Sequence, residues 1–293
     1  MKKFISYIFS ISLFIFISMF ILDVVYTKIY KNSIPRNTLQ YLLKTEKMEF
    51  DVIFLGSSRV VNHIDTKLYE TLSNKKTINL GVEGVTLKDN LLQLKLLIKN
   101  NKPISKIFLQ LDTNFNLDST SNVMASEAMP FLKNEIIKTH FKKYYKNFNY
   151  LYYSPFYRYI AYGPKIGFRE AFFSVLNKSP RIEPSIGFLP KYGNDLSKQW
   201  VLYPSISNKN FALEEITKIC DQNNIELILF TSPYCSKLGN RNYIEQLKNK
   251  IPYLLDLSNG YENELFHDCG HLNIKGAKLF TENLYYTSIK KDL

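Results

Sequence analysis

A serine that follows a short apolar run has the position of a nucleophile. Residues 51–55 read Asp-Val-Ile-Phe-Leu and lead into Gly56, Ser57 and Ser58. An apolar run that stops at Gly and Ser is typical of a buried strand entering a turn. A serine at a tight strand-to-helix turn exposes its hydroxyl and holds its own N–H beside a developing oxyanion. Ser58 is therefore the candidate nucleophile, although ordinary turns also collect small residues.

A base for that serine is predicted near the C-terminus, where Asp268 precedes His271 by three residues. A serine hydroxyl is a weak nucleophile until a base takes its proton, and the base needs an acceptor that fixes its tautomer. One turn of chain can place the Asp268 carboxylate on one ring nitrogen and Ser58 on the other. The alternative is that His271 caps a helix while Asp268 pairs with a surface lysine. His267 is the nearest competing base.

Two further motifs follow apolar runs and offer hydrogen-bond donors. Gly84 comes after the run at 77–80, and Asn114 after the run at 106–111. A glycine lets the backbone come close and point an N–H at a reaction centre, and an asparagine amide can do the same from a side chain. With the N–H of Ser58 they form a candidate oxyanion site. No metal-ligand spacing is present, so no metal or cofactor is expected.

The order of apolar runs predicts the fold that positions these residues. Strands and helices alternate before residue 115 and after residue 208, which favours a parallel sheet covered by helices on both faces. Ligands bind beyond the carboxyl ends of such strands, so the four motifs are expected to meet at one edge. The expected strands cover residues 51–55, 77–80, 106–111, 225–231 and 252–257, and the expected helices residues 87–98, 211–222, 240–250 and 274–285.

The N-terminus predicts a membrane anchor. Two lysines precede residues 4–22, a stretch of 19 residues without charge, and about 20 apolar residues span a bilayer core as a helix. Lysines before the span favour a cytoplasmic N-terminus, so the rest of the chain is expected outside the cytoplasm. A cleaved signal peptide is the alternative, but residues 21–26 contain no Ala-x-Ala-like site. The expected layout is an anchor at 1–28, a linker at 29–50 and one domain at 51–293.

An insertion at about 115–208 interrupts the alternation and is rich in Tyr, Phe and Lys. It is expected to be mainly helical before about residue 178 and irregular after it. Such a composition serves to pack a cap onto the sheet, to sit at a membrane interface, or to bind sugar rings or single-stranded nucleic acid. The net charge of +12 comes from scattered Lys and Arg, whereas a nucleic-acid binder clusters them in a patch. Nucleic acid is therefore not expected as a partner.

The cysteine count argues against a disulfide scaffold. Three cysteines, Cys220, Cys235 and Cys269, leave at least one free thiol. A bridge between Cys235 and Cys269 is geometrically conceivable, because both are expected on loops at one face of the sheet. The sequence alone does not favour it.

Taken in order, the four motifs resemble the sequence blocks of the SGNH hydrolase superfamily, which includes GDSL-type lipases and esterases. The resemblance covers about 51–114 and 225–285. It is carried by Gly56-Ser57-Ser58, by Gly84 with Thr86, by Asn114, and by Asp268 and His271 with Leu272, Asn273 and Gly276. Three positions depart from the pattern: Ser57 stands for the usual aspartate, Asp112 for a glycine, and Phe115 for the aspartate after the asparagine.

The resemblance implies a three-layer α/β/α sandwich with a flavodoxin-like parallel sheet. It implies Ser58, His271 and Asp268 as catalytic residues and Ser58, Gly84 and Asn114 as oxyanion donors. The expected function is that of an extracytoplasmic serine-dependent O-acyltransferase acting on acyl esters of a cell-surface glycan. A polysaccharide and a multi-pass membrane acyltransferase are the implied partners. A carbohydrate esterase or deacetylase, and a non-catalytic glycan- or partner-binding protein, are the alternatives.

Overall fold

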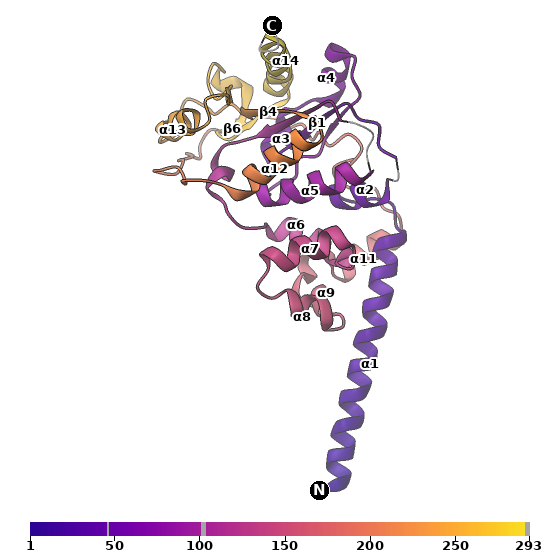
Figure 1. Cartoon of the computed structure of the whole chain (residues 1–293). Helices are drawn as coiled ribbons and strands as arrows, with labels where there is room; N and C mark the ends of the chain where they lie inside the picture. Colours follow the sequence, from indigo (N-terminus) through magenta and orange to yellow (C-terminus); the bar gives the residue numbers. More distant parts are fainter. Residues whose placement is uncertain (46, 101–103, 291–293) are drawn as a thin grey trace. The chain divides into compact units, whose positions relative to one another are not determined.

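The computed structural model describes residues 1–45, 47–100 and 104–290. These residues form two compact units, one made of residues 1–36 and 122–180 and the other of residues 37–121 and 181–293 (Figure 1). Residue 46 of the expected linker, and residues 101–103 and 291–293 of the expected domain, lie outside the described residues. The second unit contains the sheet and is called the sheet unit below.

The sheet unit is built on five parallel strands in the order β2-β1-β3-β4-β5. This is the flavodoxin-like order, and the chain reverses its winding direction between β1 and β3. The strands are β1 (Val52–Leu55), β2 (Thr77–Asn79), β3 (Lys106–Gln110), β4 (Glu226–Thr231) and β5 (Leu255–Asp256). The predicted parallel sheet is confirmed, and β5 is shorter than the expected run at 252–257.

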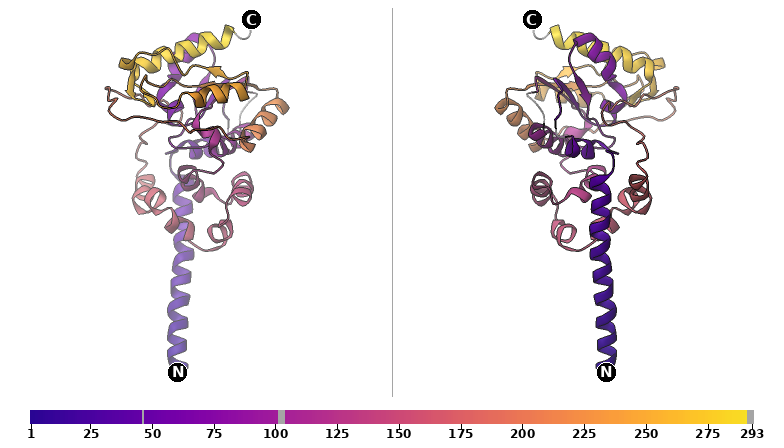
Figure 2. Two further views of the ribbon diagram at one scale, coloured as in Figure 1. Left: turned by 90° about the vertical axis from the view of Figure 1, so that its left-hand side faces the viewer. Right: turned by 90° about the vertical axis from the view of Figure 1, so that its right-hand side faces the viewer.

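Helices cover both faces of the sheet, which confirms the three-layer arrangement (Figure 2). On one face α5 contacts α2 and α12, and on the other α14 contacts α3 and α4. The first group is α2 (Thr38–Lys44), α5 (Leu87–Asn100) and α12 (Phe211–Gln222). The second is α3 (Ser58–His63), α4 (Thr66–Ser73) and α14 (Ile274–Lys290), and α13 (Asn242–Lys250) packs into the same core.

Apolar side chains that alternate along the strands form this second core. Phe54 of β1, Phe108 of β3 and Phe230 of β4 point to the same face and are fully buried with Phe280 of α14. Successive strand residues point to opposite faces, so the residues between them fill the core under α5 and α12. The strands are therefore held on both sides, and their carboxyl ends are fixed relative to one another.

A two-stranded antiparallel hairpin was not predicted from the sequence. It consists of β6 (Phe266–Asp268) and β7 (His271–Leu272). The backbone N–H of Leu272 donates to Nε2 of His63 at the end of α3, over 3.0 Å. The hairpin therefore lies against the helix that begins at Ser58.

A disulfide joins Cys235, on the loop after β4, to Cys269 in the turn of this hairpin. The sequence alone did not favour this bridge. The two Cα atoms lie 4.7 Å apart, because the loop and the hairpin also share a hydrogen bond from Cys235 N–H to the carbonyl of Cys269. Cys220 is a buried free thiol, as the odd count requires.

The other unit consists of α1 and a group of short helices. α1 (Lys2–Asn32) is long and apolar enough to cross a membrane. Residues 115–208 are helical only up to Val175, as expected, and their last part, 181–208, belongs to the sheet unit. The short helices are α6 (Asn122–Ala128), α7 (Glu135–Tyr144), α8 (Phe148–Tyr153), α9 (Tyr157–Ala161), α10 (Gly163–Ile166) and α11 (Phe168–Val175). A single 3-10 turn lies at Met129–Phe131 in this unit, and two others lie at Thr113–Asn116 and Asn263–Leu265 in the sheet unit.

The expected boundary between an anchor at 1–28 and a linker at 29–50 does not match the helices. α1 continues to Asn32, because Tyr30 is buried and its hydroxyl donates to the carbonyl of Ile166 over 2.9 Å. α2 then lies within the expected linker, where Leu39 and Leu42 are fully buried. Apolar side chains thus make part of this segment a packed component of the fold.

Candidate active site

Ser58 is the first residue of α3 and follows the turn that leaves β1. Ser57 caps this helix, and its N–H and hydroxyl both donate to Oε1 of Gln110, over 3.0 and 2.9 Å. Gln110 is the last residue of β3, the neighbouring strand. The turn is therefore fastened to the sheet by Ser57.

The hydroxyl of Ser58 lies 2.9 Å from Nε2 of His271. Nδ1 of His271 lies 2.9 and 3.0 Å from the two carboxylate oxygens of Asp268. The structure thus brings together the three residues that the sequence singled out, from segments 213 residues apart. A histidine held between a hydroxyl and a carboxylate has the geometry needed to accept the serine proton.

Asp268 is suited to orient the ring because it stays ionised. Burial raises the pKa of its carboxyl group, but the hydrogen bond and charge of His271 and the N–H of Gly270 outweigh this and lower the pKa to about 2. The Gly270 N–H lies 2.9 Å from Oδ1. A carboxylate on Nδ1 favours the tautomer whose Nε2 is free to accept a proton, and it stabilises the imidazolium that forms.

The single tryptophan of the chain shapes the other side of the histidine. The Trp200 ring meets the His271 ring edge to face, with centroids 5.6 Å apart. A Cβ atom at Gly270 would lie 2.5 Å from Trp200, so only glycine allows this close approach. The other histidines near the site have structural partners: His267 contacts the carbonyl of Tyr192 over 2.7 Å. His63, whose pKa burial lowers, accepts the N–H of Leu272.

All three expected oxyanion donors line one pocket of about 180 Å³. The backbone N–H groups of Ser58 and Gly84 have no acceptor within the described part of the chain. Gly84 has φ +78°, a left-handed conformation that glycine adopts without strain. The Asn114 amide donates one N–H to the carbonyl of Gln110 over 3.0 Å, which leaves its second N–H. Three donors at one pocket can hold a developing oxyanion.

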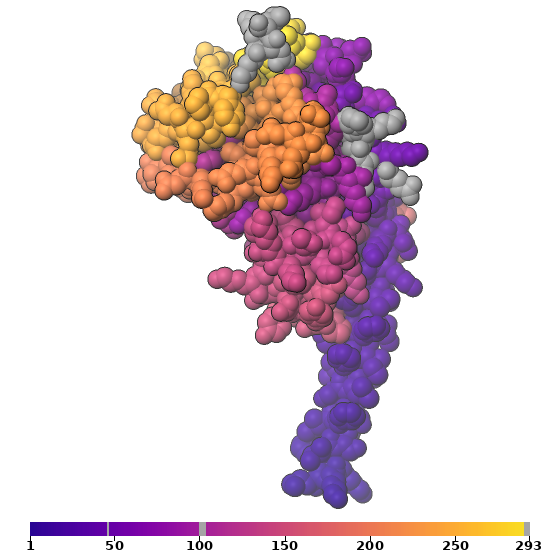
Figure 3. Space-filling view, viewed as in Figure 1, coloured from indigo at the N-terminus to yellow at the C-terminus, as the bar shows by residue number. Residues whose placement is uncertain are grey.

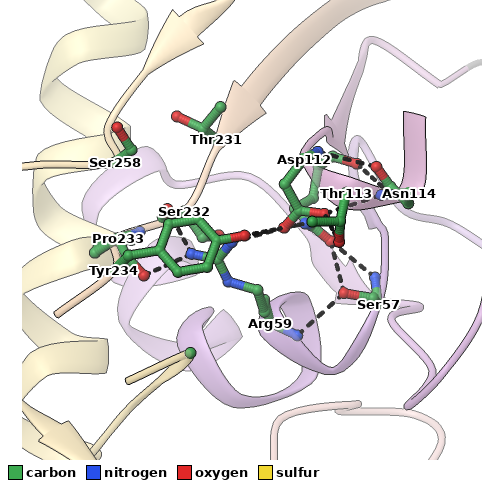
Figure 4. A network of polar contacts seen from close by, with 12 residues as sticks. Ser57, Arg59, Asp112, Thr113, Asn114, Thr231, Ser232, Pro233, Tyr234 and Ser258 are labelled. Atoms are coloured by element: carbon green, nitrogen blue, oxygen red, sulfur yellow. Dashed lines mark hydrogen bonds and ion pairs between the residues drawn. The ribbon is translucent and has the colours of Figure 1, made fainter. Parts of the chain in front are cut away.

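A buried ion pair behind Ser58 was missed by sequence reasoning. Arg59 Nη1 lies 2.6 Å from Oδ2 of Asp112, and the two side chains are 3% and 5% exposed (Figure 4). The same Asp112 oxygen accepts from the Gln110 amide and, over 3.3 Å, from the Tyr234 hydroxyl. Arg59 also donates to the carbonyls of Ser232 and Pro233 over 2.5 Å, and it stacks on the Tyr234 ring at 3.6 Å.

This network joins the ends of three strands beneath the pocket. Arg59 follows β1, Asp112 follows β3, and Tyr234 follows β4. Asp112 stands where the family that the sequence blocks resemble carries a glycine. Two features of the sequence could have indicated the ion pair: a charged residue, Asp112, directly after an apolar strand, and an arginine directly after the candidate serine. Among the described residues, no cluster of three or more His, Cys, Asp or Glu is placed to hold a metal ion.

Fold and site together define an α/β protein with a hydrogen-bonded Ser–His–Asp series at the carboxyl edge of a parallel sheet. No family model and no curated protein matches the chain by sequence. It is similar to a solved structure from Streptococcus pneumonia, provisionally described as a platelet activating factor, with 13% identity over 94% of this chain and 97% of that one and a TM-score of 0.42.

A second similar structure is a protein from Desulfitobacterium hafniense DCB-2, provisionally described as a lipolytic protein of the G-D-S-L family. The identity is 11%, the match covers 82% of this chain and 98% of that one, and the TM-score is 0.39. Its family is the one that the sequence blocks resemble.

Proposed function

We propose that this chain is a membrane-anchored enzyme of the SGNH hydrolase type that performs serine-dependent acyl-ester chemistry. The observation that carries the proposal is the series Ser58, His271 and Asp268, with contacts of 2.9 Å on both sides of the ring. A binding protein has no need of a serine aligned with a base and an orienting carboxylate. The non-catalytic alternative is thereby disfavoured.

The reaction follows from this geometry. His271 Nε2 takes the Ser58 proton as Oγ attacks the acyl carbonyl, and the N–H groups of Ser58, Gly84 and Asn114 stabilise the oxyanion. The tetrahedral intermediate collapses, and the alcohol leaves with the proton that His271 held. A water molecule or a sugar hydroxyl then gives its proton to His271 and attacks the acyl-serine. The second collapse returns the proton to Ser58 and releases the acylated acceptor or the free acid.

The pocket favours a short acyl group on a sugar. Its volume of about 180 Å³ is below the roughly 300–1,000 Å³ of pockets that hold drug-sized ligands. Trp200 lines it beside His271, and an aromatic side chain at this place suits the apolar side of a sugar ring. We propose the acyl ester of a cell-surface glycan as substrate, with transfer to a sugar hydroxyl. A multi-pass membrane acyltransferase is the partner that could supply the acyl group.

Hydrolysis is the second candidate, and one observation favours it. A cap that excludes water from the site would favour transfer to a sugar hydroxyl. Of the eleven residues that line the pocket, two, Leu117 and Trp200, come from the expected insertion at 115–208, and the other nine come from the segments that follow the strands of the sheet. Water is therefore a competing acceptor.

Two features support a position outside the cytoplasm. α1 begins with Lys2 and Lys3 and continues as an apolar helix, which favours a cytoplasmic N-terminus. The Cys235–Cys269 disulfide is of a kind that persists in oxidising compartments and is rare in the cytosol. We therefore propose α1 as a single-pass anchor of the cytoplasmic membrane, with the sheet unit on the far side.

Product analysis tests the function. Full-length protein in detergent would be given p-nitrophenyl acetate with and without an oligosaccharide acceptor, and acetate and acetylated sugar would be measured by mass spectrometry. We expect nitrophenol release that Ser58→Ala abolishes. Acetylated sugar identifies transfer, and acetate alone identifies hydrolysis. Absence of both products from folded wild type would refute acyl-ester chemistry on short acyl groups.

A further inference from the structure

The length of α1 fixes where the chain leaves the membrane. The charge-free residues 4–22 span about 28 Å at 1.5 Å per residue, close to the thickness of a hydrocarbon core of about 30 Å. Asp23, the next residue, is therefore at the outer boundary of that core. An unpaired carboxylate at this depth is costly.

Asp23 is neutralised by the helical insertion. Its Oδ1 accepts from Arg158 Nη2 over 2.6 Å, and the two side chains are 12% and 4% exposed. Its Oδ2 accepts the backbone N–H of Phe156 over 2.9 Å. One turn further along α1, Thr27 contacts the hydroxyl of Tyr159 over 2.8 Å. These bonds fix α9 beside α1 at the level where α1 leaves the hydrocarbon core.

The edge formed by α8 and α9 carries exposed aromatic and aliphatic side chains at this same level. Tyr153 is 73% exposed, Tyr150 66%, Ile160 58% and Tyr157 40%. Figure 1 shows α8 and α9 at the end of the insertion nearest the N-terminal half of α1, and α1 beyond them is bare in the view of Figure 3. Tyrosines gather at membrane–water interfaces, where the ring meets apolar groups and the hydroxyl meets water.

The charge of the insertion suits the same environment. Residues 122–180 contain nine Lys and Arg against three Glu and no Asp. Basic residues near a bilayer are attracted by anionic headgroups, at about 1 kcal/mol each. α11 carries a second exposed apolar row that includes Phe168 and Phe172, but its Glu170 pairs with Arg36, which follows the end of α1 at Asn32. Asn32 is about 14 Å beyond Asp23 at 1.5 Å per residue, so this row is not assigned to lipid.

We propose that the α8–α9 edge, defined by Tyr150, Tyr153, Tyr157 and Ile160, is seated in the interfacial layer of the bilayer that α1 crosses. This inference rests on the proposed anchoring by α1, and not on the acyl chemistry. The insertion then acts as a collar. It holds α1 by the Asp23–Arg158 pair and reaches lipid with its exposed edge.

Depth-dependent quenching tests the seating on the full chain, reconstituted into vesicles of phosphatidylcholine with a minority of phosphatidylglycerol. Two native cysteines form the disulfide and Cys220 is buried, so an introduced thiol is labelled selectively with an environment-sensitive fluorophore. The variants are Tyr157→Cys at the edge and, as matched control, the exposed Ser179→Cys next to Lys178, whose carbonyl accepts from Arg36. Ile160→Cys is a second edge variant, and Phe14→Cys reports the span.

We expect nitroxide lipids labelled near the headgroup to quench positions 157 and 160 several-fold more than position 179, with aqueous iodide showing the reverse order. Equal iodide quenching at 157, 160 and 179, with position 14 still quenched by deep nitroxides, would refute the seating and leave the anchor intact. An edge that binds a protein partner instead of lipid would give this equal iodide quenching, because the vesicles contain no such partner. Failure of deep nitroxides to quench position 14 would overturn both the anchor and the seating. Ester hydrolysis by the same variants tests the proposed active site independently of either result.

Discussion

Removing the carboxylate of Asp112 should destabilise the sheet unit far more than removing a carboxylate from an exposed ion pair. Asp112→Asn keeps the shape of the side chain but leaves the Arg59 guanidinium buried without a counter-charge. Arg59 is 3% exposed and cannot reach water without breaking its bonds to the carbonyls of Ser232 and Pro233. Breaking a buried pair by removing one partner costs about 3–5 kcal/mol. We expect that loss in the free energy of unfolding.

The matched control is an exposed pair in the same unit. Arg181 and Glu83 lie 3.4 Å apart with 69% and 40% of their side chains exposed. Exposed pairs contribute about 0–1 kcal/mol, so Glu83→Gln should change the free energy of unfolding by less than about 1 kcal/mol. The ratio of the two losses isolates the effect of burial from the effect of charge.

Urea unfolding of the full chain in detergent, followed by Trp200 fluorescence, measures both variants, because the only tryptophan lies in this unit beside His271. Replacing both partners, Arg59→Met with Asp112→Asn, should cost less than the sum of the single variants, by about 0.5–3 kcal/mol. A loss below about 1 kcal/mol for Asp112→Asn, or strictly additive single variants, would show that the pair is not a structural centre of the site.

Three further outcomes are expected. Replacing Cys235 and Cys269 by alanine should lower the free energy of unfolding by up to about 4 kcal/mol, because the disulfide closes a loop of 34 residues. It should also reduce kcat, because Cys269 lies between Asp268 and His271 in the chain. An unchanged urea midpoint would contradict this expectation. Asn114→Ala should lower kcat by about 10²–10³ at nearly constant KM, and unaltered ester turnover would remove Asn114 from the oxyanion site. Burial raises the pKa of Asp89 to about 6, so the protonated carboxyl group stabilises the folded state below about pH 4, and this stabilisation is lost as the pH rises through 6. In urea unfolding measured across this pH range, Asp89→Asn should make the free energy of unfolding depend less on pH. The same pH dependence in wild type and variant would refute the raised pKa of Asp89.

The sequence predicted those parts of the fold that have a strong local pattern. The apolar run before Ser58 and the runs at 106–111 and 225–231 are long enough to read as buried strands, and they form β1, β3 and β4 in parallel. The order of these runs and of the run at 77–80 placed Ser58, Gly84 and Asn114 at one edge, because the carboxyl ends of parallel strands meet there. Local pattern and topology together thus fixed half of the site.

The remainder depended on contacts between distant segments. The β6–β7 hairpin has strands of three and two residues, too short to show a period of two. The Arg59–Asp112 pair joins residues 53 positions apart, and a charge at the end of a strand gives no indication of its partner. The Asp23–Arg158 pair joins the insertion to α1 across 135 positions. It could not be predicted for the same physical reason, because a buried charge requires a partner that only the folded chain supplies.

The hydrogen-bonded positions of Ser58 and His271 predict that Ser58 is an activated nucleophile. The most direct measurement is labelling of full-length protein with a fluorophosphonate probe, in wild type, Ser58→Ala, His271→Ala and the control His267→Ala. We expect one adduct in the tryptic peptide that ends at Arg59, placed on Ser58 rather than Ser57 by fragmentation. It should be absent in Ser58→Ala, strongly reduced in His271→Ala and retained in His267→Ala. Equal labelling of all four proteins, or an adduct on another serine, would contradict the proposed active site.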